Sequence, residues 1–215
     1  MNTRLSCLTH ALMICFVFAL PASAQTLYEN GPINGQTDAW TINFGFVVSD
    51  SFTISTGSST LTGLSFGAWI TPGDLVESAE FQISSEAMGG TLYFDQQVNV
   101  TQSGCFLNQY NYNVCTETGS FNGPTLGNGT YWLNLQNVVT TEGDPVYWDE
   151  NSGIGCHSAG CPSQACCGNC EGTIPSEAFT VLGTTETGSV PEPSSLLLFS
   201  GGVLSVVGIL RRKRL

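Results

Sequence analysis

The central part of the chain, residues 25–190, contains no lysine and no arginine. All five basic residues of the 215-residue chain lie near its ends, at Arg4 and at positions 211–214. The same central part carries sixteen Asp and Glu residues and one histidine, His157. Without basic side chains it cannot neutralise phosphates, which excludes nucleic acid as a partner. Its carboxylates must be solvated, hydrogen-bonded to N–H groups, or bound to external cations.

Recognisable catalytic motifs are also missing from the chain. A G-x-S-x-G string occurs at residues 63–67, but it lies in a segment with strand alternation rather than at a turn into a helix, and there is no H-E-x-x-H zinc motif. The sequence therefore predicts a protein that is not an enzyme. A secreted polysaccharide hydrolase is an alternative, because two of the sixteen carboxylates could converge in the fold, and sequence spacing does not reveal such a pair.

Long helical patterns are scarce. Four segments, at residues 64–70, 79–83, 92–100 and 131–135, alternate apolar and polar residues with a period of two and are predicted to be strands. Further strands are expected at residues 40–48, 51–55 and 178–182. Gly- and Pro-containing turn signals separate the runs. This pattern predicts an all-β domain, an antiparallel β-sandwich of jelly-roll type. The residues expected to face the core are Leu64, Phe66, Ala68, Ile70, Ala79, Phe81, Ile83, Leu92, Phe94, Val98, Val100, Tyr131, Leu133 and Leu135.

The N-terminus reads as a secretory signal peptide, residues 1–24. Arg4 supplies the positive charge, and residues 11–20 form an apolar run that ends before a small-residue cleavage pattern. Cleavage between Ala24 and Gln25 is expected.

The C-terminus has three parts in a fixed order. A polar linker, residues 184–189, separates the acidic domain (25–183) from the tail. The tail starts with the motif at 190–193, continues as seventeen uncharged residues at 194–210, and ends with a basic segment at 211–215. Seventeen helical residues span about 26 Å, enough for a single transmembrane helix, and the basic end should stay cytoplasmic. The motif is Val190, Pro191, Glu192 and Pro193; the basic residues are Arg211, Arg212, Lys213 and Arg214.

This tripartite tail resembles the PEP-CTERM sorting signal of exported bacterial proteins. The resemblance implies recognition and processing by an exosortase, a membrane-embedded enzyme, with a location at the membrane and then at the cell surface or in the extracellular matrix. It also implies a link to exopolysaccharide and biofilm. We therefore expect a structural or adhesive surface protein.

An acidic, oxygen-rich stretch follows the alternating segment at residues 131–135. Glu142, Asp144, Asp149 and Glu150 lie within ten residues and are candidate Ca²⁺ ligands. No EF-hand spacing supports them, and the alternative is a solvated acidic loop. No other cofactor is expected.

Aromatic residues near the same stretch give a second alternative function. Trp132, Tyr147 and Trp148 could present rings to sugars, as in a carbohydrate-binding module, or could pack in the core.

Seven cysteines lie outside the signal peptide, five of them in a Cys-rich loop at residues 156–170. In an exported protein the default is disulfide formation, with zinc binding or redox chemistry as alternatives. Cys105 and Cys115 could close a hairpin, whereas pairing inside the loop cannot be read from the sequence. The candidates are Cys105, Cys115, Cys156, Cys161, Cys166, Cys167 and Cys170.

Overall fold

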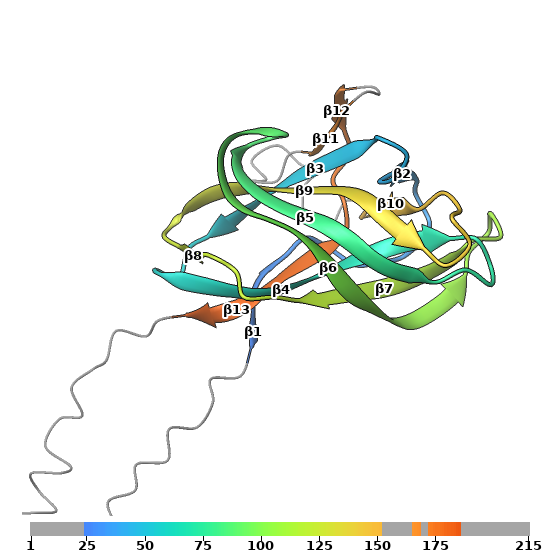
Figure 1. The fold of residues 1–215 in the computed structure, drawn as a ribbon, viewed down its shortest axis with the longest axis horizontal. Helices are drawn as coiled ribbons and strands as arrows, with labels where there is room; N and C mark the ends of the chain where they lie inside the picture. The colour runs from blue at the N-terminus through green and yellow to red at the C-terminus, as the bar shows by residue number, and fades with distance from the viewer. Residues whose placement is uncertain (1–23, 152–164, 169–171, 186–215) are drawn as a thin grey trace, which may run out of the picture.

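The computed structural model describes residues 24–151, 165–168 and 172–185, and these are folded as β-strands without a helix (Figure 1). The all-β prediction is therefore confirmed. The strands are β1 (Gln25–Glu29), β2 (Ala39–Thr41), β3 (Val47–Ile54), β4 (Ser59–Ile70), β5 (Val76–Glu86), β6 (Gly89–Leu107), β7 (Asn113–Ser120), β8 (Thr125–Leu126), β9 (Gly129–Thr140), β10 (Tyr147–Asp149), β11 (Ala165–Gly168), β12 (Gly172–Ile174) and β13 (Phe179–Thr185).

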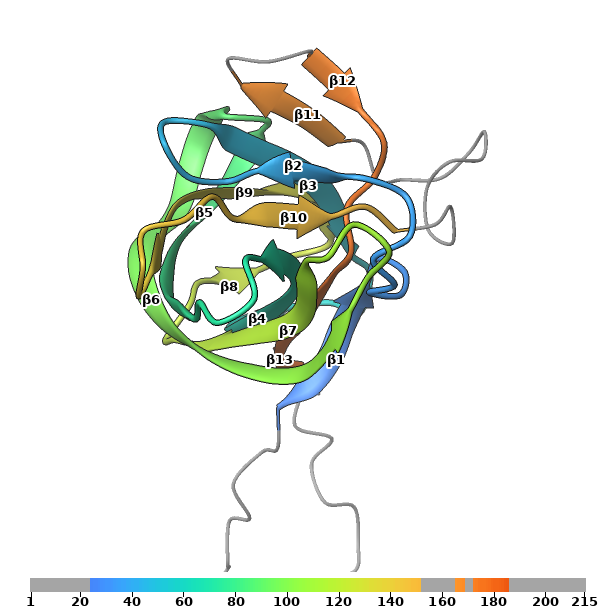
Figure 2. The ribbon, with the colours of Figure 1, turned by 90° about the vertical axis from the view of Figure 1, so that its right-hand side faces the viewer.

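One antiparallel sheet curls over itself to make two facing layers, and the long strand β6 joins them. Residues 89–99 of β6 pair with β5, whereas residues 100–107 pair with β7. The order along the sheet is β1-β13-β4-β7-β6-β5-β9-β3-β11-β12; beside this path, β8 and β10 pair with β4, and β2 pairs with β10. Figure 2 shows β6 bending around one side of the body from one layer to the other.

The apolar residues of the alternating segments fill the space between the layers, as predicted. The predicted core residues of β4 and β5 are fully buried, as are Leu133 and Leu135 of β9, and Phe66 lies edge-to-face against Phe81. Val100 and Tyr131 are half-buried and pack against this core. Leu92 is the exception: it was expected inside but is 54% exposed. The register of β5 and β6 shifts between Ile83 and Ser84, and residues 89–93 beyond the shift lie in an exposed hairpin end.

The predicted strand at residues 40–48 is wrong, because two elements share it. β2 ends at Thr41 and β3 begins at Val47. Between them Phe44 and Gly45 have φ angles of 54° and 86°, which no extended strand allows. β3 then continues through the separately predicted strand at residues 51–55.

The two predicted processing segments lie outside the described residues. This applies to the signal peptide and to the tail at 190–215, and the part of the chain that the structure describes contains no helix suited to span a membrane. Thr184 and Thr185, expected in the linker, belong to β13. Four residues of the Cys-rich loop form β11, which pairs with β3 and β12.

Candidate functional site

Strand β13 leads directly from the body into the predicted tail. It lies between β1 and β4, and both pairings are antiparallel (Figure 1). Gln25 pairs with Gly183, and the Gln25 side-chain amide donates a hydrogen bond of 2.9 Å to the Thr185 hydroxyl. The start of the predicted mature chain and the beginning of the tail therefore leave the body at the same end.

Three carboxylates face the interior at one end of the core, and we call them the carboxylate cluster: Asp50 on β3, Glu150 after β10, and Glu177 before β13. Each is at most 2% exposed. The residues two positions away on the same segments are buried core aromatics: Phe52, Trp148 and Phe179. Alternation along a strand thus turns the three carboxylates toward the same interior. They come from both layers, since β3 belongs to one and β10 and β13 to the other.

Asp50 and Glu150 accept hydrogen bonds that favour their charged forms. Asp50 Oδ2 accepts from Asn30 Nδ2 at 2.9 Å, from the Ser176 hydroxyl at 2.8 Å and from the Glu177 main-chain N–H at 2.7 Å. Glu150 Oε1 accepts the indole N–H of Trp40 at 2.7 Å. Hydrogen bonds to a carboxylate stabilise its ionised form.

Glu177 differs from its two neighbours. Its side chain is fully buried, and neither carboxyl oxygen has a hydrogen-bond partner among the described residues. Burial raises the pKa of Glu177 well above its ordinary value, and the charges of Asp50 and Glu150 raise it further. Such a group either keeps a proton or requires a cation beside it.

Asp149, one of the predicted Ca²⁺ ligands, lies on the outer side of the sheet and fixes a loop. Its carboxylate accepts main-chain N–H groups of Asn34 at 2.8 Å and Gly35 at 3.1 Å, and the indole N–H of Trp69 at 2.6 Å. Burial raises the pKa of Asp149, while these three donors act in the opposite direction. The absence of a side chain at Gly67 makes room for Asp149, because a Cβ at Gly67 would lie 2.8 Å from Asp149 Cβ.

The other predicted ligands lie elsewhere. Glu142 is exposed and Asp144 half-buried in the loop after β9, where the Glu142 N–H donates to Asp74 Oδ1 at 3.0 Å. Burial tends to raise the pKa of Asp74, but hydrogen bonds from Thr141, Thr140 and the main chain outweigh it and lower that pKa to about 2. Within residues 24–151, 165–168 and 172–185, no group of three or more Asp, Glu, His or Cys side chains is arranged to hold a metal ion.

The three aromatic residues predicted to contact sugars lie in different environments. Trp148 is fully buried and donates its indole N–H to the Ala178 carbonyl at 2.9 Å, so it is a core residue. Trp132 is half-buried on β9.

Only Tyr147 joins a surface group, which we call the aromatic patch: Trp69, Tyr110, Tyr112 and Tyr147. Trp69 and Tyr110 are stacked with ring centroids 5.6 Å apart, and Tyr112 meets Tyr147 edge-on at 5.5 Å. Burial and the neighbouring Tyr112 raise the pKa of Tyr147 to about 12. Tyr110 is 54% exposed and forms the outer ring of the patch.

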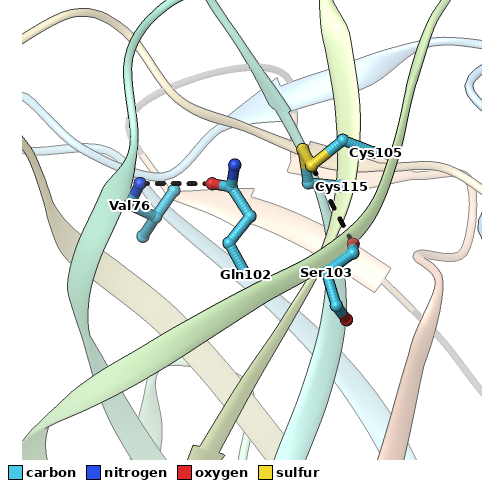
Figure 3. The surroundings of a disulfide bond; sticks show 5 residues. All are labelled: Val76, Gln102, Ser103, Cys105 and Cys115. Atoms are coloured by element: carbon cyan, nitrogen blue, oxygen red, sulfur yellow. Dashed lines mark hydrogen bonds between the residues drawn. A yellow bond between two sulfur atoms is a disulfide. The ribbon is translucent and has the colours of Figure 1, made fainter.

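A disulfide lies at the base of the loop that carries Tyr110. Cys105 on β6 and Cys115 on β7 are joined, with Cα atoms 4.2 Å apart (Figure 3). Gly104 beside it has a φ angle of 63°, at the point where the β6–β7 register shifts. Cys156, Cys161 and Cys170 lie outside the described residues, and only the backbone of Cys166 and Cys167 is described.

Sequence reasoning missed Asp50 and Glu177, although a signal for them exists. Each occupies a position where alternation calls for an apolar side chain. Asp50 lies two positions from the buried residues Val48 and Phe52, and Glu177 lies two positions before the buried Phe179. An acidic residue on the inward phase of a strand is costly, so it marks a site of interest.

The family comparison concerns the tail. A family model described as the PEP-CTERM protein-sorting motif matches residues 189–214. No curated protein matches the chain. The motif implies export, membrane anchoring through the C-terminal region and processing by an exosortase. The chain therefore carries a match to the PEP-CTERM protein-sorting motif, which begins four residues beyond the last strand of an acidic β-domain.

Proposed function

We propose that this protein displays its acidic β-domain at the cell surface and serves a structural or adhesive role in extracellular polysaccharide, without enzymatic activity. The sorting motif supports the location, because it begins at residue 189 and the last strand ends at Thr185. A link this short keeps the folded body close to the membrane until the tail is processed.

The attachment of the tail to the body supports a structural role. Any force on the tail reaches the body through β13, which is hydrogen-bonded along both edges, to β1 and to β4. A strand held on two sides resists extraction better than an edge strand does, because twice as many hydrogen bonds must open.

The enclosed carboxylates support the absence of catalysis. The carboxylate cluster is at most 2% exposed, so no substrate reaches it in the folded state. A groove of about 320 Å³ next to Phe44 and Asn137 is lined by neutral side chains only.

The location is tested in the producing cell with a doubly substituted motif, Pro191→Ala with Glu192→Ala. We expect the wild-type protein to lose its C-terminal segment and reach the cell surface, whereas the variant stays full-length in the membrane. Thr187→Ala, two residues before the matched motif, is the matched control and should be processed normally. Equal processing of all three proteins would contradict exosortase sorting.

The structural role is tested by deleting the gene and weighing the polysaccharide that remains attached to washed cells. We expect a loss that the wild-type gene restores and the motif variant does not. Unchanged retention in the deletion strain, with the protein correctly sorted in the parent, would refute the role and leave the sorting intact.

The aromatic patch favours a second candidate function, carbohydrate binding. Tyr110 is exposed, backed by Trp69, and carried on a disulfide-closed loop, which suits a flat sugar ring. A sandwich of jelly-roll type, which the sequence predicts, would suit this role.

Binding is tested with a glycan array and the Tyr110→Ala variant. We expect this variant to lose at least ten-fold in affinity for any polysaccharide that the wild-type protein binds. The control is Tyr93→Ala, because Tyr93 is 41% exposed but packs against Tyr131 away from the patch. Equal losses in both variants would exclude the patch as the binding surface.

A further inference from the structure

The segment that joins β6 to β7 contains only asparagine, glutamine and tyrosine, and we call it the amide–tyrosine loop: Asn108, Gln109, Tyr110, Asn111, Tyr112 and Asn113. It lies within a longer stretch, residues 96–116, that holds no Asp, Glu, Lys, Arg or His, although residues 25–190 carry sixteen acidic residues. Amide groups donate and accept hydrogen bonds without a charge, and tyrosine adds a flat ring and a hydroxyl. The loop therefore offers contacts that suit an uncharged ligand rich in hydroxyl groups.

Hydrogen bonds within the loop hold its shape. The Asn108 side-chain oxygen accepts the main-chain N–H groups of Tyr110 and Tyr112, both at 3.0 Å, and the Asn108 N–H donates to the Tyr112 carbonyl at 2.9 Å. Asn111 has a φ angle of 66°, a left-handed conformation that asparagine tolerates in turns. The disulfide between Cys105 and Cys115 closes the base of the loop. A loop fixed in this way loses little conformational entropy when it binds a ligand.

The outer ring of the loop is flanked by exposed amides. Tyr110 is stacked on Trp69, which covers one side of the ring, and Tyr110 remains 54% exposed. Its neighbours Gln109 and Asn111 are exposed as well. The Gln109 amide donates a hydrogen bond of 3.1 Å to the Gln36 carbonyl, which ties the loop to the neighbouring segment before β2. A flat ring between two amides can stack against a sugar and hydrogen-bond to its hydroxyl groups.

Strand β4 places this loop at the end of the body opposite to the tail. Thr185, the last residue before the tail, pairs with Ser59 at the start of β4, whereas Trp69 near the end of β4 pairs with Tyr147 of the aromatic patch. The two pairings are about 33 Å apart along the strand. Figure 1 shows β13 ending at one end of β4 and the β6–β7 connection at the other. With the tail in the membrane, the loop faces away from the cell.

We propose that the amide–tyrosine loop binds an uncharged polysaccharide, with Tyr110 stacked on the C–H face of a pyranose ring and with Gln109 and Asn111 hydrogen-bonded to its hydroxyls. This inference rests on the candidate function of carbohydrate binding and names the class of sugar. An acidic polymer is disfavoured, because residues 25–190 hold no lysine or arginine to pair with its carboxylates and the acidic body repels it. An amino-sugar polymer finds no carboxylate within residues 96–116 to select it.

The class of sugar is tested by calorimetry on the full chain, solubilised in mild detergent and kept in about 0.1 M NaCl, where surface charges still act over about 10 Å. The neutral probes are cellohexaose, laminarihexaose and mannohexaose, and the acidic probe is a galacturonic acid hexamer. We expect one or more neutral hexamers to bind about ten-fold tighter than the acidic one. Equal or tighter binding of the acidic hexamer would overturn the inference and leave carbohydrate binding intact. Absence of binding to all four would remove both.

The residues are tested with the neutral hexamer that binds best. Gln109→Ala and Asn111→Gly should each lower the affinity about three- to ten-fold, and glycine keeps the φ angle of Asn111 accessible. Tyr110→Phe retains the ring and should keep most of the affinity. The control is Gln96→Ala, an exposed glutamine on the part of β6 that pairs with β5. Unchanged affinity in both amide variants, or an equal loss in the control, would overturn the assignment of the loop.

Discussion

Glu117 on β7 is paired with Phe66 on β4, and its carboxyl group lies inside the apolar core. The side chain is fully buried, and neither of its oxygens has a hydrogen-bond partner among the described residues. Gly119, two positions further along β7, faces the ring of Phe81. Residues two positions apart on a strand share a face, so Glu117 also points into the core. Burial raises the pKa of Glu117 to about 8. Near neutral pH it is therefore a protonated acid.

Stability should consequently fall as the pH rises. The raised folded-state pKa means that stability from Glu117 is fully present below about pH 4.5 and is lost as pH rises through about 8. The loss attributable to this residue is on the order of 4 kcal/mol. We expect Glu117→Gln, which cannot ionise, to gain that amount over wild type between pH 5 and pH 9. Chemical denaturation at both pH values measures it, with exposed Glu77→Gln as the control. Parallel pH profiles for wild type and Glu117→Gln would rule the assignment out.

Gly183 on β13 is closely surrounded, so a methyl group there should loosen the strand that leads to the tail. A Cβ would overlap Leu27 Cδ1 and the Thr60 carbonyl oxygen, and that carbonyl belongs to the backbone of the neighbouring strand β4. We expect Gly183→Ala to lower the free energy of unfolding by about 1–3 kcal/mol. Gly127→Ala is the matched control, since nothing lies within 4 Å of its Cβ. Similar stability of the two variants would show that β1 and β4 accommodate the added group.

The disulfide between Cys105 and Cys115 should stabilise the folded state. It closes a short loop, with a sequence separation of 10 residues. Loop-closure entropy predicts that replacing both cysteines by alanine costs about 2–3 kcal/mol. Denaturant unfolding of the double variant measures this loss. The single variant Cys105→Ala should lose nearly as much, because either change opens the bridge; a negligible loss in both would mean that β6 and β7 hold the loop closed without it.

Salt should stabilise the acidic domain. Residues 25–190 carry sixteen Asp and Glu residues and no lysine or arginine; the ionised carboxylates among them repel one another, and added ions screen this repulsion. In EDTA, we expect the melting temperature to rise by about 2–8 °C between 20 mM and 500 mM NaCl. A constant or falling value would show that the carboxylates lie too far apart to repel.

Strands with regular alternation were predictable from the sequence. In β4 and β5 every apolar residue assigned to the core is buried, because a period of two leaves one face for the interior. The prediction failed where backbone geometry interrupts the pattern. Leu92 lies beyond a register shift between β5 and β6, and the segment around Phe44 turns through positive φ angles. Neither irregularity has a strong signal in the sequence.

The candidate site was less predictable, since its members are far apart in the sequence. The acidic stretch 142–150 drew attention by its density, yet Asp149 holds a loop and Glu142 is solvated. Only Glu150 joins the cluster, together with Asp50 and Glu177 from other strands. Local density of charge says little about a buried site, because the fold brings together residues separated by more than a hundred positions.

The sequence by itself determined the C-terminal sorting motif and the chemical character of this protein. A sorting motif, an apolar run and a charge composition act through local order or through sums over the chain, and neither depends on folding. The tertiary structure alone decided which carboxylates are solvated and which face each other in the core. Burial and proximity are set by the pairing of distant strands, and they determine whether a carboxyl group stays charged, keeps its proton or requires a cation.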